Sequence, residues 1–435
     1  MKILVAGAGI GGLYAAGLFA DAGHETIVFE KAERVEEMRY DWHDDVNPGV
    51  FKKLGLSVPQ GSYPKKNWTF ITPFEKGRMP LYQREDLIDV SVNRKQLNKD
   101  LVDRASKVKF VWGAEALKAI VNGDRVVGLE IKEKGSRKEV FGDLIIDACG
   151  VFSPIRKSLP DSFSIPDVDK SSVFFVRRFF FKAKEGVPFP SDTNKVYMKH
   201  IGQKGISWCI ACDDGTVDVL IGRVGELDDQ TVKDSLADLR AHNPILSEEA
   251  VRGGDYCAIP VRRPLSKFVA DGYACIGDSA CMTVPMIGSG IATSLLAADI
   301  LYKTVSENNS SSVSDLWKYQ VATEKLFGAE HSAVETMKNW LLEQKNDDIH
   351  FFLTSGILRN EDLQDASVGK MMKLVFPDVL HKGWVGMRRP GLLVKTLGML
   401  LAANKAKSVS KSIPEKYDEA KVLRWQKKSD GCFKQ

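Results

Sequence analysis

Several features that mark whole classes of protein are missing from this sequence. Its seven cysteines are scattered and odd in number, which argues against a disulfide framework and favours thiols kept reduced in the cytoplasm. The longest apolar-rich stretch, 392–403, is too short to cross a bilayer and contains Lys395. Four glycines interrupt the apolar run at the start of the chain, which is not the pattern of a signal peptide. We therefore expect a cytoplasmic protein without a spanning segment.

A strong net charge is also absent, so we expect no nucleic-acid partner. The 61 Lys and Arg residues nearly balance the 57 Asp and Glu residues, which leaves a net charge of +4. The balance is uneven, because residues 404–435 hold nine basic and four acidic side chains. A basic tail indicates either a solvated surface or contact with an acidic partner or an anionic membrane. The remaining composition is that of a globular protein, and 435 residues are enough for two or three domains.

The N-terminus contains a dinucleotide-binding pattern in its full context. The apolar run 2–6 predicts a buried parallel strand that leads into a glycine-rich turn and a helical segment. A second strand, 26–29, ends in Glu30, whose spacing after Gly12 suits a carboxylate that binds an adenosine ribose. The glycines let the backbone approach a pyrophosphate at the positive end of the helix. The predicted nucleotide-binding residues are Gly7, Gly9, Ile10, Gly11, Gly12, Glu30 and Lys31.

A second motif favours FAD over NAD as the cofactor. Residues 273–276 predict a buried strand, from which Gly277 and Asp278 turn out before a long helix rich in Ala and Leu. The Asp278 carboxylate can accept hydrogen bonds from a ribityl hydroxyl, and the helix N–H groups would face the flavin edge that becomes negative on reduction. The segment 272–301 resembles the second flavin motif of FAD-dependent oxidoreductases of the geranylgeranyl reductase and para-hydroxybenzoate-hydroxylase-like superfamily. The predicted FAD-binding residues here are Asp278, Pro285, Gly288, Ser289, Gly290 and Ile291.

The resemblance covers most of residues 1–300. It implies that Arg94, which opens a helix shortly before an inward-facing Leu, contacts the FAD pyrophosphate, and it adds Ala116 to the cofactor-binding residues. Alternating apolar residues between 165 and 260 predict an antiparallel sheet over the flavin. We therefore expect an α/β fold with three parts: a Rossmann-type FAD-binding domain (1–60, 93–165 and 255–310), an antiparallel-sheet substrate domain (61–92 and 166–254) and a helical C-terminal region (311–435).

The chain departs from the family pattern at Cys149. The related hydroxylases have the Asp of an Asp-Gly motif there, and that motif is associated with FAD and NADPH contacts. Losing the carboxylate predicts slow direct reduction by NADPH, and the sequence contains no second GxGxxG motif. The external electron donor is therefore left open between NAD(P)H and an electron-transfer protein.

Three residues are candidates for the substrate pocket. Trp208 matches the Trp of a Tyr-x-Trp-x-Phe-Pro segment in geranylgeranyl reductases, although the other residues of that segment are replaced here. His43 stands where related enzymes place flavin-proximal residues, and Cys281 follows Asp278 closely. Each has a plainer alternative: a core tryptophan, a histidine in a solvated loop and a packed thiol. No catalytic residue is assigned, and no metal site is expected.

The region beyond about residue 310 shows no motif that can be assigned. Pro390 begins a helical run with leucines on one face and lysines after it, so 392–411 either docks on the body of the protein or contacts a membrane peripherally. The leading functional hypothesis, implied by the resemblance, is reduction of a carbon–carbon double bond in an apolar, prenyl-like or lipid-like substrate. One alternative is a monooxygenase that hydroxylates a small aromatic. The other is a non-catalytic carrier that binds a prenyl group and FAD.

Overall fold

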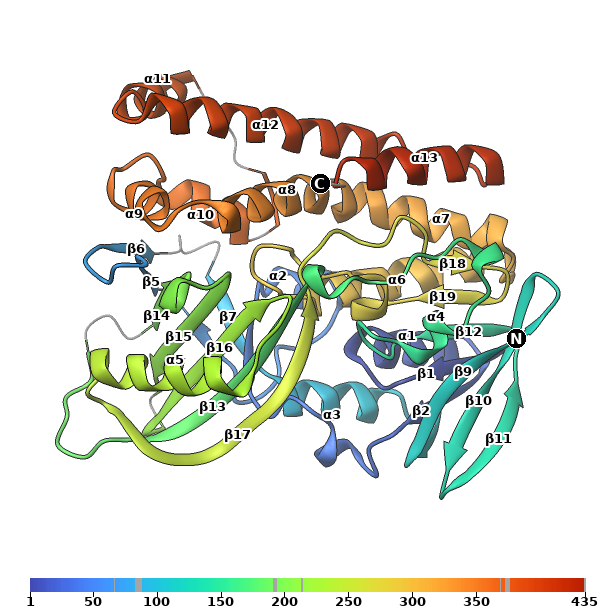
Figure 1. Cartoon of the computed structure of the whole chain (residues 1–435). Coiled ribbons are helices and arrows are strands. Elements are labelled where there is room, and N and C mark those ends of the chain that lie inside the picture. Colours follow the sequence, from blue (N-terminus) through green and yellow to red (C-terminus); the bar gives the residue numbers. More distant parts are fainter. Residues whose placement is uncertain are drawn as a thin grey trace.

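A computed structural model describes residues 1–65, 67–82, 88–190, 194–212, 214–367, 369–371 and 376–433 of the chain. Its elements form three parts (Figure 1): a largely parallel sheet near the N-terminus, a long antiparallel sheet beside it, and a set of helices that lies across both. This confirms the α/β fold with an antiparallel sheet and a helical C-terminal region. The exact domain boundaries given above stay a prediction.

The six-stranded sheet is built around the N-terminal strand. Strand β1 pairs in parallel with β2 on one side and β12 on the other, and Ile3 to Ala6 are fully buried, as expected for a strand covered on both faces. Helices α1 and α6 pack against each other beside this sheet. The strands across the sheet are β18 (Val269–Ala270), β19 (Tyr273–Cys275), β12 (Leu144–Asp147), β1 (Lys2–Ala6), β2 (Glu25–Glu30) and β8 (Lys109–Trp112). The helices of this part are α1 (Ile10–Asp21), α2 (Gly49–Leu54), α3 (Arg94–Arg104), α4 (Pro154–Lys157) and α6 (Ile291–Asn308), and a three-stranded sheet consists of β9 (Ala114–Asn122), β10 (Arg125–Glu133) and β11 (Ser136–Phe141).

The seven-stranded sheet has two faces with different partners. Along β16, Val217, Val219 and Ile221 pack on the side of helix α5, whereas Leu220 joins a cluster on the opposite face. In order across the sheet the strands are β17 (Leu246–Pro260), β13 (Val173–Ala183), β16 (Thr216–Val224), β15 (Gly205–Ala211), β14 (Asn194–Met198), β5 (Asn67–Ile71) and β6 (Arg78–Tyr82). Helix α5 spans Asp229–His242, and a small sheet is formed by β3 (His43–Val46), β7 (Asp89–Asn93) and β4 (Tyr63–Lys65).

The C-terminal helices pack on one another and on both sheets. Helix α12 runs along α8, and Met399 and Ala403 contact Ala333 and Met337 there. A π-helical turn, Glu324–Gly328, joins α7 to α8, and the buried Glu324 carboxylate accepts a hydrogen bond from Ser410 of α12. The helices are α7 (Val313–Thr323), α8 (Ala329–Glu343), α9 (Asn346–Thr354), α10 (Asn360–Ser367), α11 (Phe376–Gly386), α12 (Pro390–Lys411) and α13 (Glu419–Gly431). Within the described residues, none of the helices combines the length and the apolar character needed to cross a bilayer.

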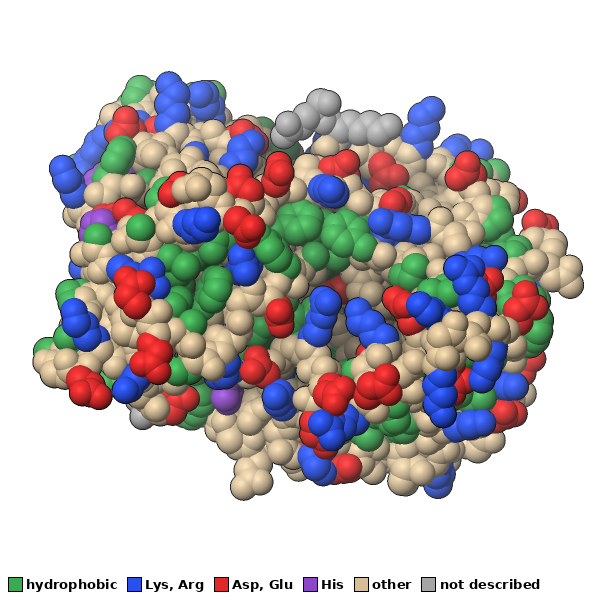
Figure 2. Space-filling view, turned by 60° about the horizontal axis from the view of Figure 1, so that its bottom comes forward, with side chains coloured by type: hydrophobic (Ala, Val, Ile, Leu, Met, Phe, Trp, Pro, Cys, Tyr) green, Lys and Arg blue, Asp and Glu red, His purple; other side chains and the backbone are tan. Residues whose placement is uncertain are grey.

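The face shown in Figure 2 carries intermixed acidic and basic side chains, in keeping with the small net charge. A hollow lies near its centre, with hydrophobic side chains along its upper rim and basic side chains below.

Candidate active site

The predicted glycine turn is held against the end of strand β12. Gly7 adopts a φ of +85°, and a Cβ atom there would lie 2.8 Å from the carbonyl oxygen of Ala148. At Gly12 an added Cβ would lie 2.7 Å from the Ala148 side chain. Only glycine allows this approach of the helix to the two strands. We call Gly7, Gly9, Gly11 and Gly12 the glycine cradle.

Glu30 lies at the end of β2 next to the glycine cradle. Its Oε2 accepts a hydrogen bond from the Ala8 N–H at 2.7 Å, and its Oε1 accepts one from the Ala32 N–H at 3.0 Å. The carboxylate is thus held beside the N-terminus of α1, whose N-cap Gly9 supplies no side-chain cap. Free helix N–H groups at such an end bind anions. The position agrees with a ribose-binding role, which stays a prediction.

Asp278 follows strand β19 and faces the first turn of α6. A Cβ atom on the N-cap residue Gly290 would lie 3.3 Å from the Asp278 Oδ1 atom, so the carboxylate and the helix N-terminus are adjacent. Burial raises the pKa of Asp278 to about 6, an effect that the Arg94 cation reduces and the Asp44 carboxylate reinforces. Among the described residues, no group donates a hydrogen bond to this carboxylate. A ligand hydroxyl would therefore find an acceptor without a protein partner.

Arg94 is the first residue of α3 and pairs with an acid from the small sheet. Its Nη1 lies 2.7 Å from Asp44 Oδ2, and its guanidinium lies 4.8 Å from the centre of the Tyr40 ring. Its Nε is buried and has no hydrogen-bond partner in the described part of the chain. A buried donor without a partner is costly, and a bound phosphate oxygen would satisfy it. This supports the predicted contact of Arg94 with a pyrophosphate.

Strand β12 ends in a carboxylate, Asp147, two positions before Cys149. Asp147 is fully buried and accepts hydrogen bonds from the Cys149 N–H at 3.0 Å and from the Ser153 and Tyr273 hydroxyls at 2.6 Å each. The Cys149 thiol donates to the Ala6 carbonyl at 3.2 Å, and burial together with Asp147 raises its pKa well above the ordinary value. The hydrogen bonds to Asp147 therefore hold the turn after β12 in place, while Cys149 lines the cavity as a neutral thiol.

A cavity of about 540 Å³ connects the cofactor motifs with the antiparallel sheet and the C-terminal helices. Its first end is lined by parts of the glycine cradle, by Asp278 and by the α6 N-terminus, and its middle by the sheet residues Phe174, Val176 and Leu220. Its far end is apolar and is lined by Met337, Trp340, Leu341, Ile349, Phe352 and Leu353. We call these six residues the apolar end. No sequence signal distinguished them from ordinary core residues of amphipathic helices.

Trp208 lines the middle of the cavity and is held by a buried ion pair. Its Nε1 donates to Asp218 Oδ1 at 3.2 Å, and the same carboxylate binds Arg178 through two hydrogen bonds of 2.9 and 2.6 Å. The Arg178 guanidinium lies 5.0 Å from the centre of the Trp208 ring and 3.5 Å from an oxygen of Asp44, which also binds Arg94. A chain of contacts thus joins the antiparallel sheet to the predicted pyrophosphate contact. Nothing in the sequence pattern indicated Arg178 or Asp218.

Some of the other predicted site residues line the cavity, and others do not. His43 lines it, with Nε2 2.9 Å from the Gly61 carbonyl oxygen. Cys281 does not line it: the residue is fully buried behind Asp278, and burial raises the pKa of its thiol to about 11. The packed-thiol alternative therefore describes Cys281 best. Of the remaining predicted residues, the cavity is lined by Gly9, Ile10, Gly11, Arg94, Asp278, Gly288, Ser289, Gly290 and Ile291, and not by Gly7, Gly12, Glu30, Lys31, Ala116 or Pro285.

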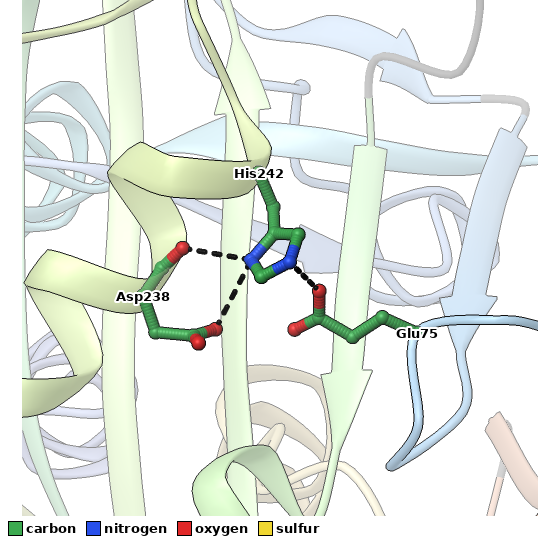
Figure 3. Close-up of side chains that lie close together, drawn as sticks. All are labelled: Glu75, Asp238 and His242. Atoms are coloured by element: carbon green, nitrogen blue, oxygen red, sulfur yellow. Dashed lines mark hydrogen bonds and ion pairs between the residues drawn. The ribbon is translucent and has the colours of Figure 1, made fainter.

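A second polar cluster lies on the α5 side of the antiparallel sheet, away from the cavity. Figure 3 shows His242 between the Asp238 carboxylate and the Glu75 carboxylate. The Nε2 atom of His242 lies 2.6 Å from Glu75, and burial together with Asp238 raises the pKa of Glu75 to about 7. The Nε2 atom of His200 lies 2.9 Å from an oxygen of Asp238. Ligand atoms of this kind and spacing could hold a cation, and their mutual contacts tie the β5–β6 turn to α5.

A Rossmann-type nucleotide unit lies beside a broad antiparallel sheet, with a cavity running between them, and solved structures share this fold. Over 404 residues the chain is 22% identical to the digeranylgeranylglycerophospholipid reductase of Sulfolobus acidocaldarius, in a match that covers 90% of this chain and 88% of that protein. The fold resembles a geranylgeranyl bacteriochlorophyll reductase-like protein from Thermoplasma acidophilum, with a TM-score of 0.73, 18% identity and coverage of 92% and 98%. It also resembles p-nitrophenol 4-monooxygenase of Pseudomonas putida, with a TM-score of 0.62, 14% identity and coverage of 86% and 99%.

No family model matches the chain. The full-length likeness to reductases and the shared fold show that the chain is similar to geranylgeranyl reductase-like FAD-dependent oxidoreductases. The resemblance seen in the sequence is confirmed.

Proposed function

We propose that the protein binds one FAD at the glycine cradle and the α6 N-terminus, and that it reduces a carbon–carbon double bond of an apolar, prenyl-like substrate. The observation that carries this proposal is the continuity of the cavity, which runs from Asp278 to the apolar end. A substrate that lies along this cavity would have one part beside the cofactor and the rest among aliphatic and aromatic side chains.

The residues at the first end of the cavity fit the chemistry of FAD. The Asp278 carboxylate offers an acceptor for a ribityl hydroxyl, Arg94 Nε offers a donor for the pyrophosphate, and the uncapped α6 N-terminus offers N–H groups. When bound and reduced, FAD supplies a hydride to one carbon of a double bond, and a proton completes the other carbon. The chain would orient both partners and exclude water from the space between them.

The apolar end favours a long hydrocarbon chain over a small aromatic substrate. It is formed by α8 and α9, and the adjacent Leu358 and Met399 extend the same apolar wall. Burial of a prenyl chain in such a wall stabilises the complex by about 0.8 kcal/mol for each methylene-sized group. Two relatives are named digeranylgeranylglycerophospholipid reductases, a name that specifies a lipid with two geranylgeranyl chains, and we extend that substrate class to this protein.

The test is a single-turnover reaction without oxygen. The purified protein, reconstituted with FAD and photoreduced, is mixed with a geranylgeranyl glycerophospholipid in detergent. The expected result is reoxidation of the flavin together with a product heavier by two hydrogens for each flavin oxidised. If the lipid leaves the flavin reduced, and a second reaction with oxygen and an added aromatic reoxidises it and yields a hydroxylated product, the proposal is overturned in favour of a monooxygenase. A protein that takes up no FAD would overturn the proposal and would favour a non-catalytic carrier that binds the prenyl group alone.

A matched pair of variants tests the role of the apolar end. Leu341 is half-buried on α8 and lines this end, so Leu341→Trp should shorten the cavity. It should slow reduction of a geranylgeranyl substrate more than that of a geranyl substrate, with FAD binding unchanged. Leu423→Trp, on the exposed side of α13, is the control for the larger side chain. Equal slowing of both chain lengths would contradict the assignment of the apolar end.

A further inference from the structure

Helices α11 and α12, with the turn between them, carry six large apolar side chains that the described rest of the chain leaves exposed. These side chains are 51–74% exposed and belong to Leu380, Trp384, Met387, Val394, Leu397 and Leu401. We call these six residues the α11–α12 surface. Figure 1 shows the two helices side by side at the edge of the molecule that is farthest from the N-terminal sheet. Side chains of this size scattered singly are ordinary, but a contiguous group marks an interaction site.

Helix α12 is apolar on two opposite faces. Leu392, Met399 and Ala403 recur at helical spacing and are buried, the last two against α8. Val394 and Leu401 lie about half a turn away from that stripe and point outward. Docking of α12 on the protein and exposure of a leucine-rich face are therefore both true of this helix. The two alternatives left open for 392–411 do not exclude each other.

The segment of chain that contains this surface is rich in basic residues. Residues 379–414 contain seven Lys or Arg side chains and no Asp or Glu. Within the described residues, three of the seven pair with acids elsewhere in the chain, whereas Arg388, Lys395, Lys405 and Lys411 form no ion pair. The Arg388 guanidinium lies 5.3 Å from the centre of the exposed Trp384 ring. Exposed leucines, an exposed tryptophan and unpaired cations on neighbouring helices are the features of a surface that lies on anionic lipid.

We propose that the α11–α12 surface docks the protein on an anionic lipid bilayer. A second copy of the chain is a poorer occupant, because a two-fold interface would bring the same unpaired cations together without an acid between them. The anionic lipid satisfies the charges, and its acyl region takes up the apolar side chains. A shallow pocket lined by Arg389, Lys395, Asp348 and the first turn of α12 lies beside this surface and has room for an anionic headgroup.

The position of α12 connects this surface to the substrate cavity. Thr396 and Met399, on the inward side of α12, line the cavity, while Leu397 lies between them on the outward side. A single helix thus separates the docked bilayer from the substrate space. This part of the inference rests on the proposed function: the bilayer is the source from which a prenyl lipid enters the cavity.

The test is sedimentation of the FAD-reconstituted protein with vesicles. Binding is expected to vesicles of equal parts phosphatidylcholine and phosphatidylglycerol, to weaken with added salt, and to be much weaker with phosphatidylcholine alone. Trp384→Ala combined with Leu397→Ser and Leu401→Ser should lower the affinity at least tenfold. Phe141→Ser, which removes a similarly exposed side chain from β11, is the control. Lys395→Ala and Lys405→Ala should each lower the affinity roughly fivefold, whereas Lys52→Ala and Lys53→Ala on α2 should have no effect.

A second measurement keeps the inference separate from the proposed reaction. Quenching of tryptophan fluorescence by lipids with brominated acyl chains should be smaller for Trp384→Phe than for the wild type, whether or not the enzyme turns over. The triple variant should retain activity on detergent-dispersed lipid and lose it on lipid in vesicles. Absence of vesicle binding, or equal binding by the triple variant, would overturn the inference. A wild-type dimer that the triple variant converts to monomers, without vesicle binding, would assign the surface to a second copy.

Discussion

The two ends of the cavity are built in different ways. The glycine cradle comes from one short stretch of chain, and its geometry depends on backbone atoms that approach Ala148 or, at Gly11, Ile276 too closely for a side chain. The apolar end comes from helices α8 and α9, far from the cradle in the sequence, and depends on side chains that fill a wall. A backbone-defined site tolerates almost no substitution and binds one kind of ligand. A side-chain-defined wall can change its length and shape while the fold persists.

Between these ends, the middle of the cavity relies on buried charge. The Arg178 and Asp218 side chains are 5% and 6% exposed and hold the position of Trp208, whereas the neighbouring Arg177–Asp229 pair is open to solvent. Matched substitutions can therefore measure separately the contributions of the close backbone approach, the buried ion pair and the apolar side chains.

The largest effect is expected when the buried ion pair is broken. Asp218→Ala leaves the Arg178 cation without its bidentate partner and should lower the free energy of unfolding by about 3–5 kcal/mol. Asp229→Ala removes the exposed partner of Arg177 and should cost less than about 1 kcal/mol. Urea unfolding of the two variants measures the difference. Similar decreases in the free energy of unfolding of the two variants would mean that burial does not determine how much each ion pair stabilises the protein.

A smaller effect is expected at the cofactor end, in binding rather than stability. Asp278→Ala should weaken FAD binding by about 1.5–3 kcal/mol, because a charge-assisted hydrogen bond is lost. Asp299→Ala removes a carboxylate of α6 that pairs with Lys303, and it should leave the affinity for FAD unchanged. Titration calorimetry with FAD on the apoprotein checks both values.

The raised pKa of Asp278 also predicts a pH dependence with opposite signs for binding and stability. The carboxylate is charged above pH about 6, so FAD affinity should fall as the pH drops through 6 in the wild type and not in Asp278→Asn. In the apoprotein a raised pKa favours the folded state at low pH. That contribution is fully present below the ordinary pKa of an aspartate and is lost as the pH rises through 6. A flat binding profile in the wild type would show that the charge of Asp278 is not used.

Two glycines of helix α1 test, with the same substitution, whether the close backbone approach requires glycine. Gly12→Ala places a Cβ atom 2.7 Å from the Ala148 side chain and should cost about 1–3 kcal/mol of stability together with loss of FAD. Gly17→Ala places it 3.6 Å from Ala105, an ordinary contact, and should stabilise the helix by about 0.5–1 kcal/mol. Thermal unfolding and flavin absorbance report the two outcomes. Equal tolerance of alanine at both positions would show that the close approach of Gly12 to Ala148 does not require glycine.

The smallest effect is expected at Cys149. NADH and NADPH should reduce the bound flavin slowly, and a reduced electron-transfer protein or dithionite should reduce it readily. Cys149→Asp restores the carboxylate of the hydroxylase motif, but Asp147 and Glu30 lie close enough to raise the pKa of a new acid there. We therefore expect a gain of at most roughly tenfold in the NADPH rate, equivalent to about 1.4 kcal/mol. Stopped-flow bleaching of the flavin band measures it, with Cys149→Ser as the control. Fast reduction of the wild type by NADPH would contradict this prediction.

The sequence alone determined the fold of the nucleotide unit and predicted its cofactor class. Strand, glycine turn, helix, second strand and acid follow one another without interruption from Lys2 to Glu30, so local spacing already defines the geometry of this unit. The Gly277–Asp278 turn and the helix after it lie close together in the sequence in the same way. Alternating apolar residues along 173–223 likewise predicted the antiparallel sheet, because successive side chains of a strand point to opposite faces of the sheet.

Only the tertiary structure decided which side chains meet. Ala148 closes on Gly12 from a distant part of the sequence, and Arg178 meets Asp218 and Trp208 through strand pairing that no local pattern encodes. Trp208 and Cys281 were both candidate pocket residues, yet one lines the cavity and the other is buried behind Asp278. Apolar residues that face a cavity and those that face a core have the same periodicity. For that reason the apolar end, and the two apolar faces of α12, become visible only when the helices are packed.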